Sequence, residues 1–505
     1  MTEKRDSFHR PKGWVRVRLG EISAKITDGT HFTPKYVENG VPFISAKDIY
    51  ERKISFDDCK YISAEEHNSL IRRCNPEYLD VLITKSGTIG RTAVVRTNRP
   101  FSLFVSVALI KPFKAYIDSD FIAFSLRNYI NNISIEQSVK GGVIKNLHIE
   151  DLKEIVLPLC PLPEQCRIVA KVEELFTNLD AGVESLKKVK MQLKRYRQAV
   201  LKYAFEGKLT EEWRKTHKDE IEPASVLLER IKEERRKNAE GKYEEMPSID
   251  TYHLPKLPET WVWTTISEFE TFIGSGITPR GGKKVYVDEG IPFIRSQNVH
   301  PDGLRLKDIA YVTPQMHEEM KRTKTHPSDV LLNITGASIG RSTYIPERLT
   351  EANVNQHVCI IRTGWWLVSP YLSSFLNSAY GQDQIFSTES GVTRQGLNYG
   401  QVRSLKIPLA PLLEQKIVAA KIEEAFSIAY ETEKSVERTL KQTNQMRQSI
   451  LKRAFEGRLV SQDSSDEPAE KLLERIKQER VKRESATKGK REIILGKMGL
   501  MRYVQ

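Results

Sequence analysis

The sequence predicts a mixed α+β protein with a pseudo-two-fold plan, in which two α/β modules are joined by two long antiparallel coiled-coil helices. An internal repeat that returns after about 250 residues is the main observation. The first part of each half contains short runs of Val, Ile, Phe and Tyr broken by Gly, Pro and Asn, which is typical of strands with short helices. The second part of each half carries a heptad pattern, which is typical of a coiled coil.

The repeat is visible in matching segments of the two halves. In the modules, Val41-Pro42-Phe43-Ile44 returns as Ile291-Pro292-Phe293-Ile294, Val81 to Arg91 returns as Val330 to Arg341, and Trp14 matches Trp261. Residues 161–210 align with residues 411–460 without a gap, including Glu164-Gln165 with Glu414-Gln415 and Ala204-Phe205-Glu206-Gly207 with Ala454-Phe455-Glu456-Gly457. A third echo joins residues 227–232 to residues 472–477. Such similarity indicates an internal duplication.

The repeat predicts six consecutive segments. They are a first module (1–160), a first spacer helix (161–210), a polar linker with a helical segment (211–250), a second module (251–410), a second spacer helix (411–460) and a polar tail (461–505). Glu164 and Glu414 each follow a proline and open a helical pattern, and an acidic residue is favourable at a helix start. Gly207 and Gly457 stand where these helices are expected to stop.

The heptads predict which faces of the two helices pack together. In the first helix one column holds Val172, Leu179, Leu186, Leu193 and Val200, and the other holds Leu175, Gly182, Val189, Tyr196 and Tyr203. In the second helix the columns are Ile422, Ala429, Val436, Thr443 and Ile450, and Ala425, Thr432, Thr439, Met446 and Arg453. Two helices of about 60 Å, packed together in one chain, would form a spacer of fixed length. A coiled coil between separate copies of the chain is the alternative.

The charge and the cysteines limit the function classes. The formal net charge of +13 favours an acidic partner such as nucleic acid. The first spacer helix has a basic face, which is either a solvated surface or a contact for phosphate or a partner: Lys187, Lys188, Lys190, Lys194, Arg195, Arg197 and Lys202. Five cysteines without a C-x-x-C pair predict neither a disulfide framework nor a zinc site, but reduced thiols in the cytoplasm. No apolar run reaches the roughly 20 residues of a membrane span, and residues 1–10 do not resemble a signal peptide.

No motif in the chain predicts an active site or a cofactor site. Asn75-Pro76-Glu77-Tyr78 differs from the methyltransferase Asn-Pro-Pro-Tyr loop, and no glycine-rich loop precedes it. The segment 276–283 does not have the glycine spacing of a phosphate-binding loop. Glu51-Arg52-Lys53 lacks the upstream acidic residue of a nuclease, and the ten histidines include no H-E-x-x-H pair. We therefore expect a protein that binds rather than catalyses.

The order of module, Pro-Leu-x-Glu-Gln to Ala-Phe-x-Gly helix, second module and second helix resembles the specificity subunits of type I restriction–modification systems. The resemblance covers nearly the whole chain except the tail from Asp463 to Gln505. It implies that the modules are target-recognition domains, each of which reads one half of a split site in double-stranded DNA. It also implies two methylation subunits and restriction subunits as partners. S-adenosylmethionine, ATP and Mg²⁺ would act on those partners, and no cofactor is expected on this chain.

The resemblance and the basic charge together suggest where DNA would be contacted. The glycine-rich turns of each module could approach phosphate, or could be turns that the fold requires. Arginine and glutamine can hydrogen-bond base edges, whereas lysine and arginine can bind phosphate. The candidate residues are Lys47 with its counterpart Gln297, and Arg91, Lys145, Arg280, Arg295, Arg341 and Arg394. Arg295 could equally be a surface ion-pair partner. Leu175, Leu186, Leu193, Ile422, Val436 and Ile450 are the candidates for the spacer and for subunit docking.

Two other classes of function are possible from the residues alone. A fused nuclease–methyltransferase fragment would need a cofactor motif, which the sequence lacks. A coiled-coil scaffold that does not bind DNA would have the same duplicated plan. Retention on heparin or duplex DNA at low but not at high salt would distinguish a DNA-binding protein from such a scaffold.

Overall fold

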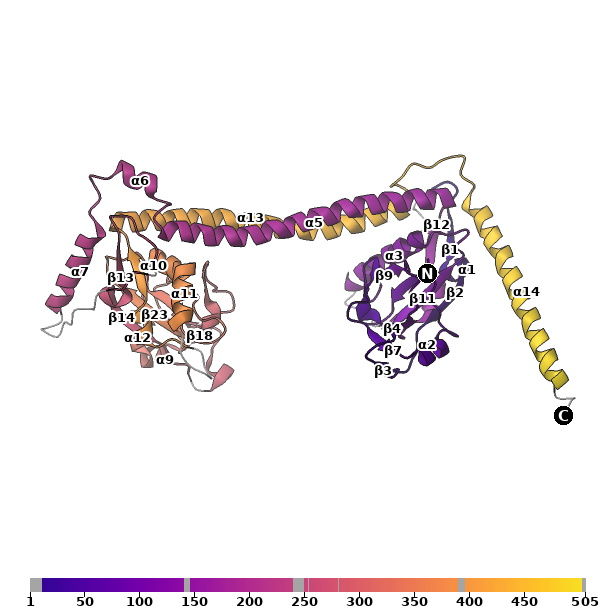
Figure 1. Ribbon diagram of the computed structural model, residues 1–505, viewed down its shortest axis with the longest axis horizontal. Helices are drawn as coiled ribbons and strands as arrows, with labels where there is room; N and C mark the ends of the chain where they lie inside the picture. The colour runs from indigo at the N-terminus through magenta and orange to yellow at the C-terminus, as the bar shows by residue number, and fades with distance from the viewer. Residues whose placement is uncertain are drawn as a thin grey trace. The chain divides into compact units, whose positions relative to one another are not determined.

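The computed structural model describes residues 11–139, 146–238, 249–252, 254–279, 281–388 and 396–501, without the side chains of residues 134–139, 238, 283–284, 388 and 486–501. The chain divides into two compact units, one of Met1–Ser185 with Thr439–Gln505 and one of Leu186–Arg438. Each unit holds one module, one end of each long helix and the helical segment that follows a long helix in the sequence (Figure 1). The division between the units therefore falls inside the long helices, and each half of the sequence contributes to both units.

The first module begins at β1 and ends at β12. Its elements are β1 (Val15–Arg18), α1 (Leu19–Ile22), β2 (Ser23–Asp28), β3 (Tyr36–Val37), β4 (Val41–Ile44), η1 (Ala46–Asp48), β5 (Ile49–Tyr50), β6 (Lys53–Ile54), β7 (Lys60–Ile62), α2 (Ala64–Leu70), β8 (Val81–Thr84), β9 (Thr92–Val94), β10 (Ser102–Leu103), β11 (Val107–Pro112), α3 (Ser119–Val139), α4 (Ile149–Glu154) and β12 (Val156–Leu159).

The second module repeats this order, with η2 in the place of β3, with η4 and β19 added after α9, and with two helices in the place of α3. Its elements are β13 (Val262–Thr265), α8 (Ile266–Phe269), β14 (Glu270–Ser275), η2 (Gly282–Val285), β15 (Ile291–Ile294), η3 (Ser296–Asn298), β16 (Val299–His300), β17 (Gly303–Leu304), β18 (Ala310–Val312), α9 (Pro314–Glu319), η4 (Lys321–Thr323), β19 (Lys324–Thr325), β20 (Val330–Asn333), β21 (Ser342–Tyr344), β22 (Ala352–Val354), β23 (Val358–Thr363), α10 (Ser369–Leu376), α11 (Ala379–Thr388), α12 (Tyr399–Arg403) and β24 (Lys406–Leu409).

The two modules share the topology of their first sheet and of three strands of their second sheet, whose fourth strand, β3 or β19, lies on opposite edges. The first contains the sheets β2-β11-β8-β9 and β10-β4-β7-β3, and the second contains β14-β23-β20-β21 and β18-β15-β22-β19. In each module the first and last strands, β1 with β12 and β13 with β24, pair antiparallel. Among the described strand pairs, β4 with β10 and β15 with β22 are parallel and the others are antiparallel. The mixed α+β class is thus confirmed.

Two helices of 44 residues each, α5 (Leu162–Phe205) and α13 (Leu412–Phe455), lie inside the predicted spacer segments. Within the first unit, Asp180 of α5 pairs with Arg447 of α13. Within the second unit, Arg197 of α5 lies 2.9 Å from Glu433 of α13. Residue numbers rise along one helix as they fall along its partner, so the helices run antiparallel in both units. The expected pairing within one chain is therefore present.

The second predicted column of each helix is confirmed only in part, since Leu175, Val189, Ala425 and Thr432 are half-buried. The column from Val172 to Val200 is buried or half-buried, as is the column from Ile422 to Ile450. Tyr196, Tyr203 and Met446, from the other predicted columns, are exposed. Residues four positions after the first column also lie at the contact. Buried or half-buried are Phe176, Val183, Arg197 and Ala204 in α5, and Phe426, Glu433, Leu440, Arg447 and Ala454 in α13, while Lys190 at this spacing is exposed. Lys190 and Arg197 were assigned to a basic outer face, but they pair with Glu433 and Glu437 across the helix contact.

The repeated Glu-Gln pair attaches each helix to its module. The indole Nε1 of Trp14 donates to Glu164 at 3.1 Å, and Trp261 Nε1 donates to Glu414 at 2.8 Å. The next residue, Gln165, donates to the Cys160 carbonyl at 2.9 Å and accepts from the Asp118 amide at 3.0 Å. Gln415 makes the equivalent two bonds, to the Ala410 carbonyl and from the Val368 amide. These buried residues therefore explain the best-matched part of the repeat.

The other end of each helix is fixed by the Ala-Phe-Glu-Gly segment. Phe205 packs edge-on against Tyr371 and Phe375 of the second module, and Phe455 packs in the same way against Phe121 of the first. Gly207 and Gly457 follow with φ of 72° and 67°, a left-handed conformation that ends a helix and favours glycine. The predicted helix stops are thus confirmed.

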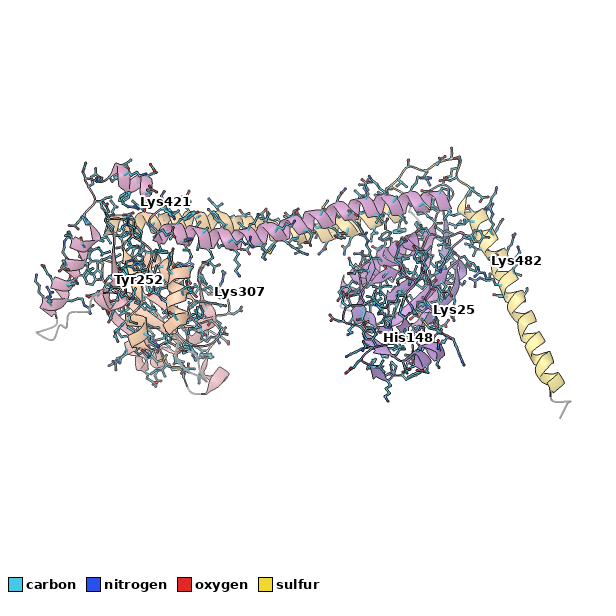
Figure 2. The ribbon with its side chains drawn as sticks, viewed as in Figure 1. Lys25, His148, Tyr252, Lys307, Lys421 and Lys482 are labelled. Carbon is cyan, nitrogen blue, oxygen red and sulfur yellow. The ribbon has the colours of Figure 1, made fainter. Side chains whose placement is uncertain are left out.

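The polar segments after the long helices contain α6 (Glu211–Thr216), α7 (Ala224–Asn238) and α14 (Ala469–Met501). Ala224, Leu227 and Ile231 of α7 belong to the core of the second module. Ala469, Leu472 and Ile476 of α14 occupy the same places in the core of the first module. The first turns of the predicted polar tail therefore complete the first module. Lys482 lies further along α14 (Figure 2).

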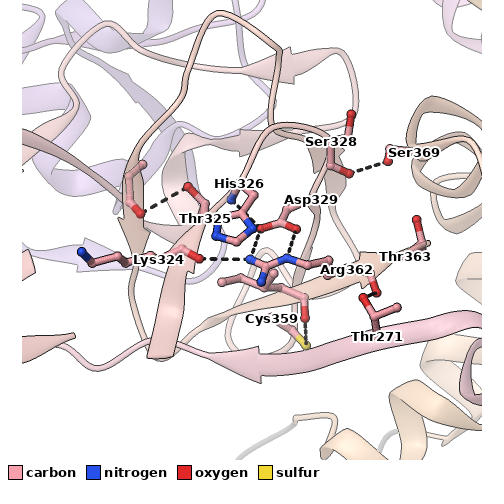
Figure 3. A network of polar contacts seen from close by, with 12 residues as sticks. Thr271, Lys324, Thr325, His326, Ser328, Asp329, Cys359, Arg362, Thr363 and Ser369 are labelled. Atoms are coloured by element: carbon pink, nitrogen blue, oxygen red, sulfur yellow. Dashed lines mark hydrogen bonds and ion pairs between the residues drawn. The ribbon is translucent and has the colours of Figure 1, made fainter. Parts of the chain in front are cut away.

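A buried carboxylate stands at the start of the central hairpin of each module. In the second module, Asp329 accepts from Arg362 Nε at 2.7 Å and from Arg362 Nη2 at 2.8 Å, and from the His326 amide at 2.7 Å (Figure 3). In the first module, Asp80 takes this place and lies 2.6 Å from both Lys111 and Lys114. The side chains of both aspartates are at most 1% exposed. The duplication has therefore kept the carboxylate and exchanged its cationic partner.

Glu164 makes the stability of the first unit depend on pH. Burial raises the pKa of the Glu164 carboxyl above its ordinary value, against the hydrogen bond from Trp14 and the charge of Arg167. A carboxyl with a raised folded-state pKa stabilises the fold fully below its unfolded pKa of about 4.3. This stabilisation is lost as the pH rises above the unfolded-state pKa and passes through the folded-state pKa of the Glu164 carboxyl. Glu164→Gln should remove that decline while its amide oxygen still accepts from Trp14.

The measurement is the urea midpoint between pH 4 and pH 7.5, for wild type and for Glu164→Gln. We expect the midpoint of the variant to vary less with pH over this range, and to be equal or higher at neutral pH. Glu150→Gln is the control, because Glu150 is a surface carboxyl whose partner among the described residues is Lys153, three residues away. An unchanged pH slope in Glu164→Gln would contradict the assignment of this slope to Glu164.

Candidate nucleic-acid interface

Four loops of the first module converge around Ser106. Its Oγ accepts from the Ala46 amide at 3.0 Å, and its carbonyl accepts from the Lys85 amide at 2.8 Å. The Lys85 carbonyl in turn accepts from the Leu147 amide, next to His148 in Figure 2. The Thr30 amide donates to the Leu103 carbonyl at 3.0 Å. These bonds join the glycine-rich loop after β2, the η1 turn, the loop after β8 and the segment that precedes α4.

The second module has the same frame around Asn355 and His357. The Ile334 amide donates to the His357 carbonyl at 3.0 Å, and the Leu397 amide donates to the Ile334 carbonyl at 2.8 Å. The Asn355 amide donates to the Ile294 carbonyl at 3.0 Å, and the Gly276 amide donates to the Asn355 carbonyl at 3.2 Å. We call each group of joined loops a loop cluster. The first loop cluster comprises residues 29–34, 45–48, 85–91, 104–106 and 146–147, and the second comprises residues 276–279, 295–298, 334–341, 355–357 and 396–397.

Close backbone approach explains one glycine in each cluster. A Cβ built on Gly29 would lie 2.0 Å from the Leu103 carbonyl oxygen. A Cβ on Gly276 would lie 1.6 Å from the carbonyl oxygen of Val354. Both distances are far below van der Waals contact, so any larger residue would separate the loops. These two glycines therefore serve the packing of the cluster, and phosphate binding is not needed to explain them.

The structure places Lys47 and Gln297 at equivalent positions. Each is the middle residue of a three-residue 3-10 helix, η1 or η3, and each is exposed. The Lys47 Nζ donates to the Asp58 carbonyl at 3.0 Å, and 58% of its side chain is exposed. Both side chains therefore stand on the surface of their loop cluster, where a ligand could reach them.

The arginine candidates differ in how free their guanidinium groups are. Arg91 donates to the Ile49 carbonyl at 3.2 Å and lies over the Tyr50 ring. Arg295 donates to the Asp308 carbonyl at 3.3 Å and lies over the Tyr286 ring. Arg341 ends the turn after β20 and is half-buried. Lys145, Arg280 and Arg394 lie outside the described residues. The ion pair considered for Arg295 is therefore replaced by a carbonyl bond and a ring contact.

Sequence reasoning missed the segment Asn355–His357, which lies at the centre of the second loop cluster. Gln356 is exposed, and His357 Nδ1 is hydrogen-bonded to the Thr335 hydroxyl. In the first module the equivalent residues are Phe104, Val105 and Ser106, which share no side-chain chemistry with them. No sequence identity therefore marks this segment as part of the repeat, although two of its backbone hydrogen bonds, to Ile44 or Ile294 and from Lys85 or Ile334, are the same in both modules.

The interior of the two clusters also differs in charge. In the first module the buried Asp28 pairs with the buried Lys85, and also with Arg73. Burial opposes ionisation of Asp28, but the hydrogen bond and charge of Lys85 outweigh it and lower the pKa of the carboxyl. In the second module Ser275 and Ile334 hold these two places. The same backbone frame thus carries different side chains in the two modules.

Neither a metal site nor a membrane helix is found in the described parts of the chain. Over the residues that the structure describes, no three His, Cys, Asp or Glu side chains are grouped closely enough to hold a metal ion. Within the same residues, every helix is too short or too polar to cross a bilayer.

Comparison with known proteins shows that one family matches both halves of the chain. The family described as "Type I restriction modification DNA specificity domain" matches residues 11–195 and again residues 258–442. The EcoBI specificity subunit of Escherichia coli is 26% identical over 482 residues, which is 92% of each chain. The EcoKI specificity subunit of E. coli strain K12 is 24% identical and covers 93% of this chain and 96% of its own.

Two solved structures are similar in fold. A chain from work on complex assembly and conformational transition of the type I R-M system has a TM-score of 0.64 at 20% identity, over 89% of this chain and 100% of that one. The HsdS subunit of Thermoanaerobacter tengcongensis has a TM-score of 0.51 at 20% identity, over 91% of this chain and 100% of its own. Both are similar to this chain in fold.

Proposed function

This chain belongs to the type I restriction–modification DNA specificity family, and on that basis we propose that each of its modules reads one half of a two-part site in double-stranded DNA. The observation that carries the proposal is the pair of loop clusters. Three of their backbone hydrogen bonds are the same in both modules, whereas their side chains differ: the exposed Lys47 stands opposite the exposed Gln297, and the half-buried Val105 stands opposite the exposed Gln356. Two unlike half-sites require two readers with a common frame and unlike side chains.

As a member of this family, the chain is a specificity subunit and not itself a catalyst. We propose that the methylation and restriction activities reside on partner subunits, two methylation subunits and additional restriction subunits. These partners would bind S-adenosylmethionine, ATP and Mg²⁺, and the exposed faces of α5 and α13 would serve as docking surfaces. The complex would act in the cytoplasm, where its DNA substrate lies. A scaffold without DNA binding is not favoured, because it gives no reason for the family match.

An exchange of modules tests the proposal. Residues 41–157 would be replaced by the corresponding segment of another specificity subunit, and the chain would be expressed with its methylation subunit in cells without other adenine methylation. We expect the methylome of the parent to show one split motif. The exchange should change one half of this motif and leave the other half and the gap unchanged.

Two outcomes of the exchange would count against the proposal. If the parent gives no split motif, the chain does not read a two-part site. If both halves change together, the modules do not read independently. Salt-dependent retention of the purified parent on duplex DNA, as log affinity falling linearly with log salt, would separately test whether the chain contacts phosphate.

A further inference from the structure

One aromatic ring joins three elements in the first unit. Phe176 of α5 is fully buried, and three guanidinium groups approach its ring. Arg52 lies 5.7 Å from the ring centroid, Arg127 also 5.7 Å, and Arg447 5.2 Å. These arginines come from the β5–β6 turn of the module, from α3 and from α13. A cation over an aromatic ring is attracted by the electrons of its face, most strongly when both are desolvated.

Two carboxylates complete the group. Asp180, one turn after Phe176 in α5, pairs with Arg447 and lies 3.6 Å from Arg52. Glu51 pairs with Arg127, whose side chain is only 11% exposed. Asp180 is thus shared between a helix–helix contact and a module–helix contact, so loss of its charge weakens both.

The turn that carries Arg52 holds it in an uncommon conformation. Its φ is 66°, a left-handed value that side-chain-bearing residues rarely adopt, and its amide donates to the Thr92 carbonyl at 3.0 Å. A cavity of about 460 Å³ lies beside the group and is lined in part by Lys53, Asp120, Glu173 and Asn444. The module also packs on α5 beside the cavity, where Phe124 meets Phe176 edge-on. The side chains of Arg52 and Asp180 are 32% and 56% exposed, so salt can screen this ion pair.

The second unit does not repeat this group within the described residues. Phe426 and Arg197 take the places of Phe176 and Arg447, but the exposed Tyr430 stands where Asp180 would be. Asp302 occupies the turn position of Arg52, and its partner is Arg305, three residues away in the same hairpin. The ion-pair contact between hairpin and spacer helix is therefore specific to the first unit.

We propose that Arg52, Asp180, Arg447 and Phe176 act as a clamp that fixes the orientation of the first module on the spacer helices. Under the proposed function, on which this part rests, these are positioning residues that set the gap between the two half-sites. Orientation matters because each additional base pair turns the second half-site by about 35° around the DNA axis. A module free to rotate would accept gaps that a fixed module rejects.

The first measurement follows the clamp without DNA. Nitroxide labels at Glu65→Cys in α2 and Asn178→Cys in α5, with Cys166→Ser to remove the exposed thiol, would report the distance between module and helix. We expect a narrow distribution in the parent and a broader one in Arg52→Ala and in Asp180→Asn, with the unfolding temperature of the parent retained in Arg52→Ala. Asp302→Ala, the matched turn position in the second unit, should leave the distribution unchanged. High salt should broaden the distribution of the parent.

The second measurement compares binding to the split site with its normal gap and with one base pair more or less. We expect Arg52→Ala and Asp180→Asn to reduce the preference for the normal gap about ten-fold, the order of one desolvated cation–ring contact. Asp302→Ala should keep the preference of the parent. A distribution as narrow in both variants as in the parent would overturn the clamp. A broadened distribution with an unchanged gap preference would overturn its role in spacing. Absence of split-site binding in the parent would instead refute the proposed function, and the label distances would still decide the clamp.

Discussion

Asp329→Asn is expected to destabilise the second unit by about 3 kcal/mol, the lower end of the cost of breaking one side of a buried ion pair. The variant keeps an oxygen that can accept from the His326 amide, but it leaves the guanidinium of Arg362 without its counter-charge. Arg362 is 26% exposed, and partial access to water places the cost at this lower end. Since native domains have stabilities of about 5–15 kcal/mol, a loss of this size removes a large part of the margin.

Tryptophan fluorescence in a denaturant titration would measure the effect of Asp329→Asn. Five of the six tryptophans lie in the second unit, so the signal reports mainly on that unit. Asp302→Asn is the control, because the Asp302–Arg305 pair is exposed and an exposed pair contributes about 0–1 kcal/mol. If the two variants had the same midpoint, the pair Asp329–Arg362 would not be a principal support of the module.

The parts of the fold that the sequence predicted are those where identity or apolar periodicity survives in both halves. Glu164-Gln165 and Glu414-Gln415 are identical because each side chain is buried and hydrogen-bonds a fixed partner, an indole for glutamate and a backbone carbonyl for glutamine. Gly207 and Gly457 are fixed by their left-handed backbone. At such positions one residue type meets the structural requirement, so the two halves keep the same residue and the repeat can be detected there.

The incorrect predictions about the helix contact concern long charged side chains, which can cover an apolar surface with their stems and pair with an opposite charge at their ends. Lys190 and Arg197 carry charge, which predicts a solvated face, yet their stems cover the helix contact while their charges meet Glu433 and Glu437. The heptad spacing placed Tyr196 and Tyr203 in a buried column, and both are exposed. The tail was predicted to be polar, but its Leu472 and Ile476 are buried in the core of the first module, far away in the sequence.

The candidate site was predictable in part. The loop positions of Lys47, Gln297, Arg91 and Arg341 follow from the repeat, since each stands next to an identical stretch. Gln356 could not be found in this way, because its counterpart Val105 differs in chemistry and only the backbone bonds relate the two. A site that must differ between the modules leaves no repeat signal where it differs. The residues of such a site can be identified only from the structure, which shows that the loops carrying them lie together.

A heptad inserted into both spacer helices is expected to weaken binding to the native split site at least about 100-fold, if the helices set the gap. Copies of residues 183–189 after Val189 and of residues 431–437 after Glu437 would lie opposite each other, because Lys190 pairs with Glu437. Seven residues lengthen each helix by about 10 Å, equivalent to about three base pairs. The binding can be measured by titration of the purified complex, after circular dichroism has shown unchanged helix content.

Length alone will not restore this binding, because DNA twists while a heptad nearly preserves the face that a coiled coil presents. Three additional base pairs turn one half-site by about 100° relative to the other, so a site with that longer gap should still bind poorly. Three inserted heptads add about 32 Å, close to one turn of DNA of about 34 Å, and should restore binding to a gap longer by about ten base pairs. Full recovery with three additional base pairs would mean that the modules reorient freely on the helices. Recovery only near ten would mean that the helices transmit both distance and rotation.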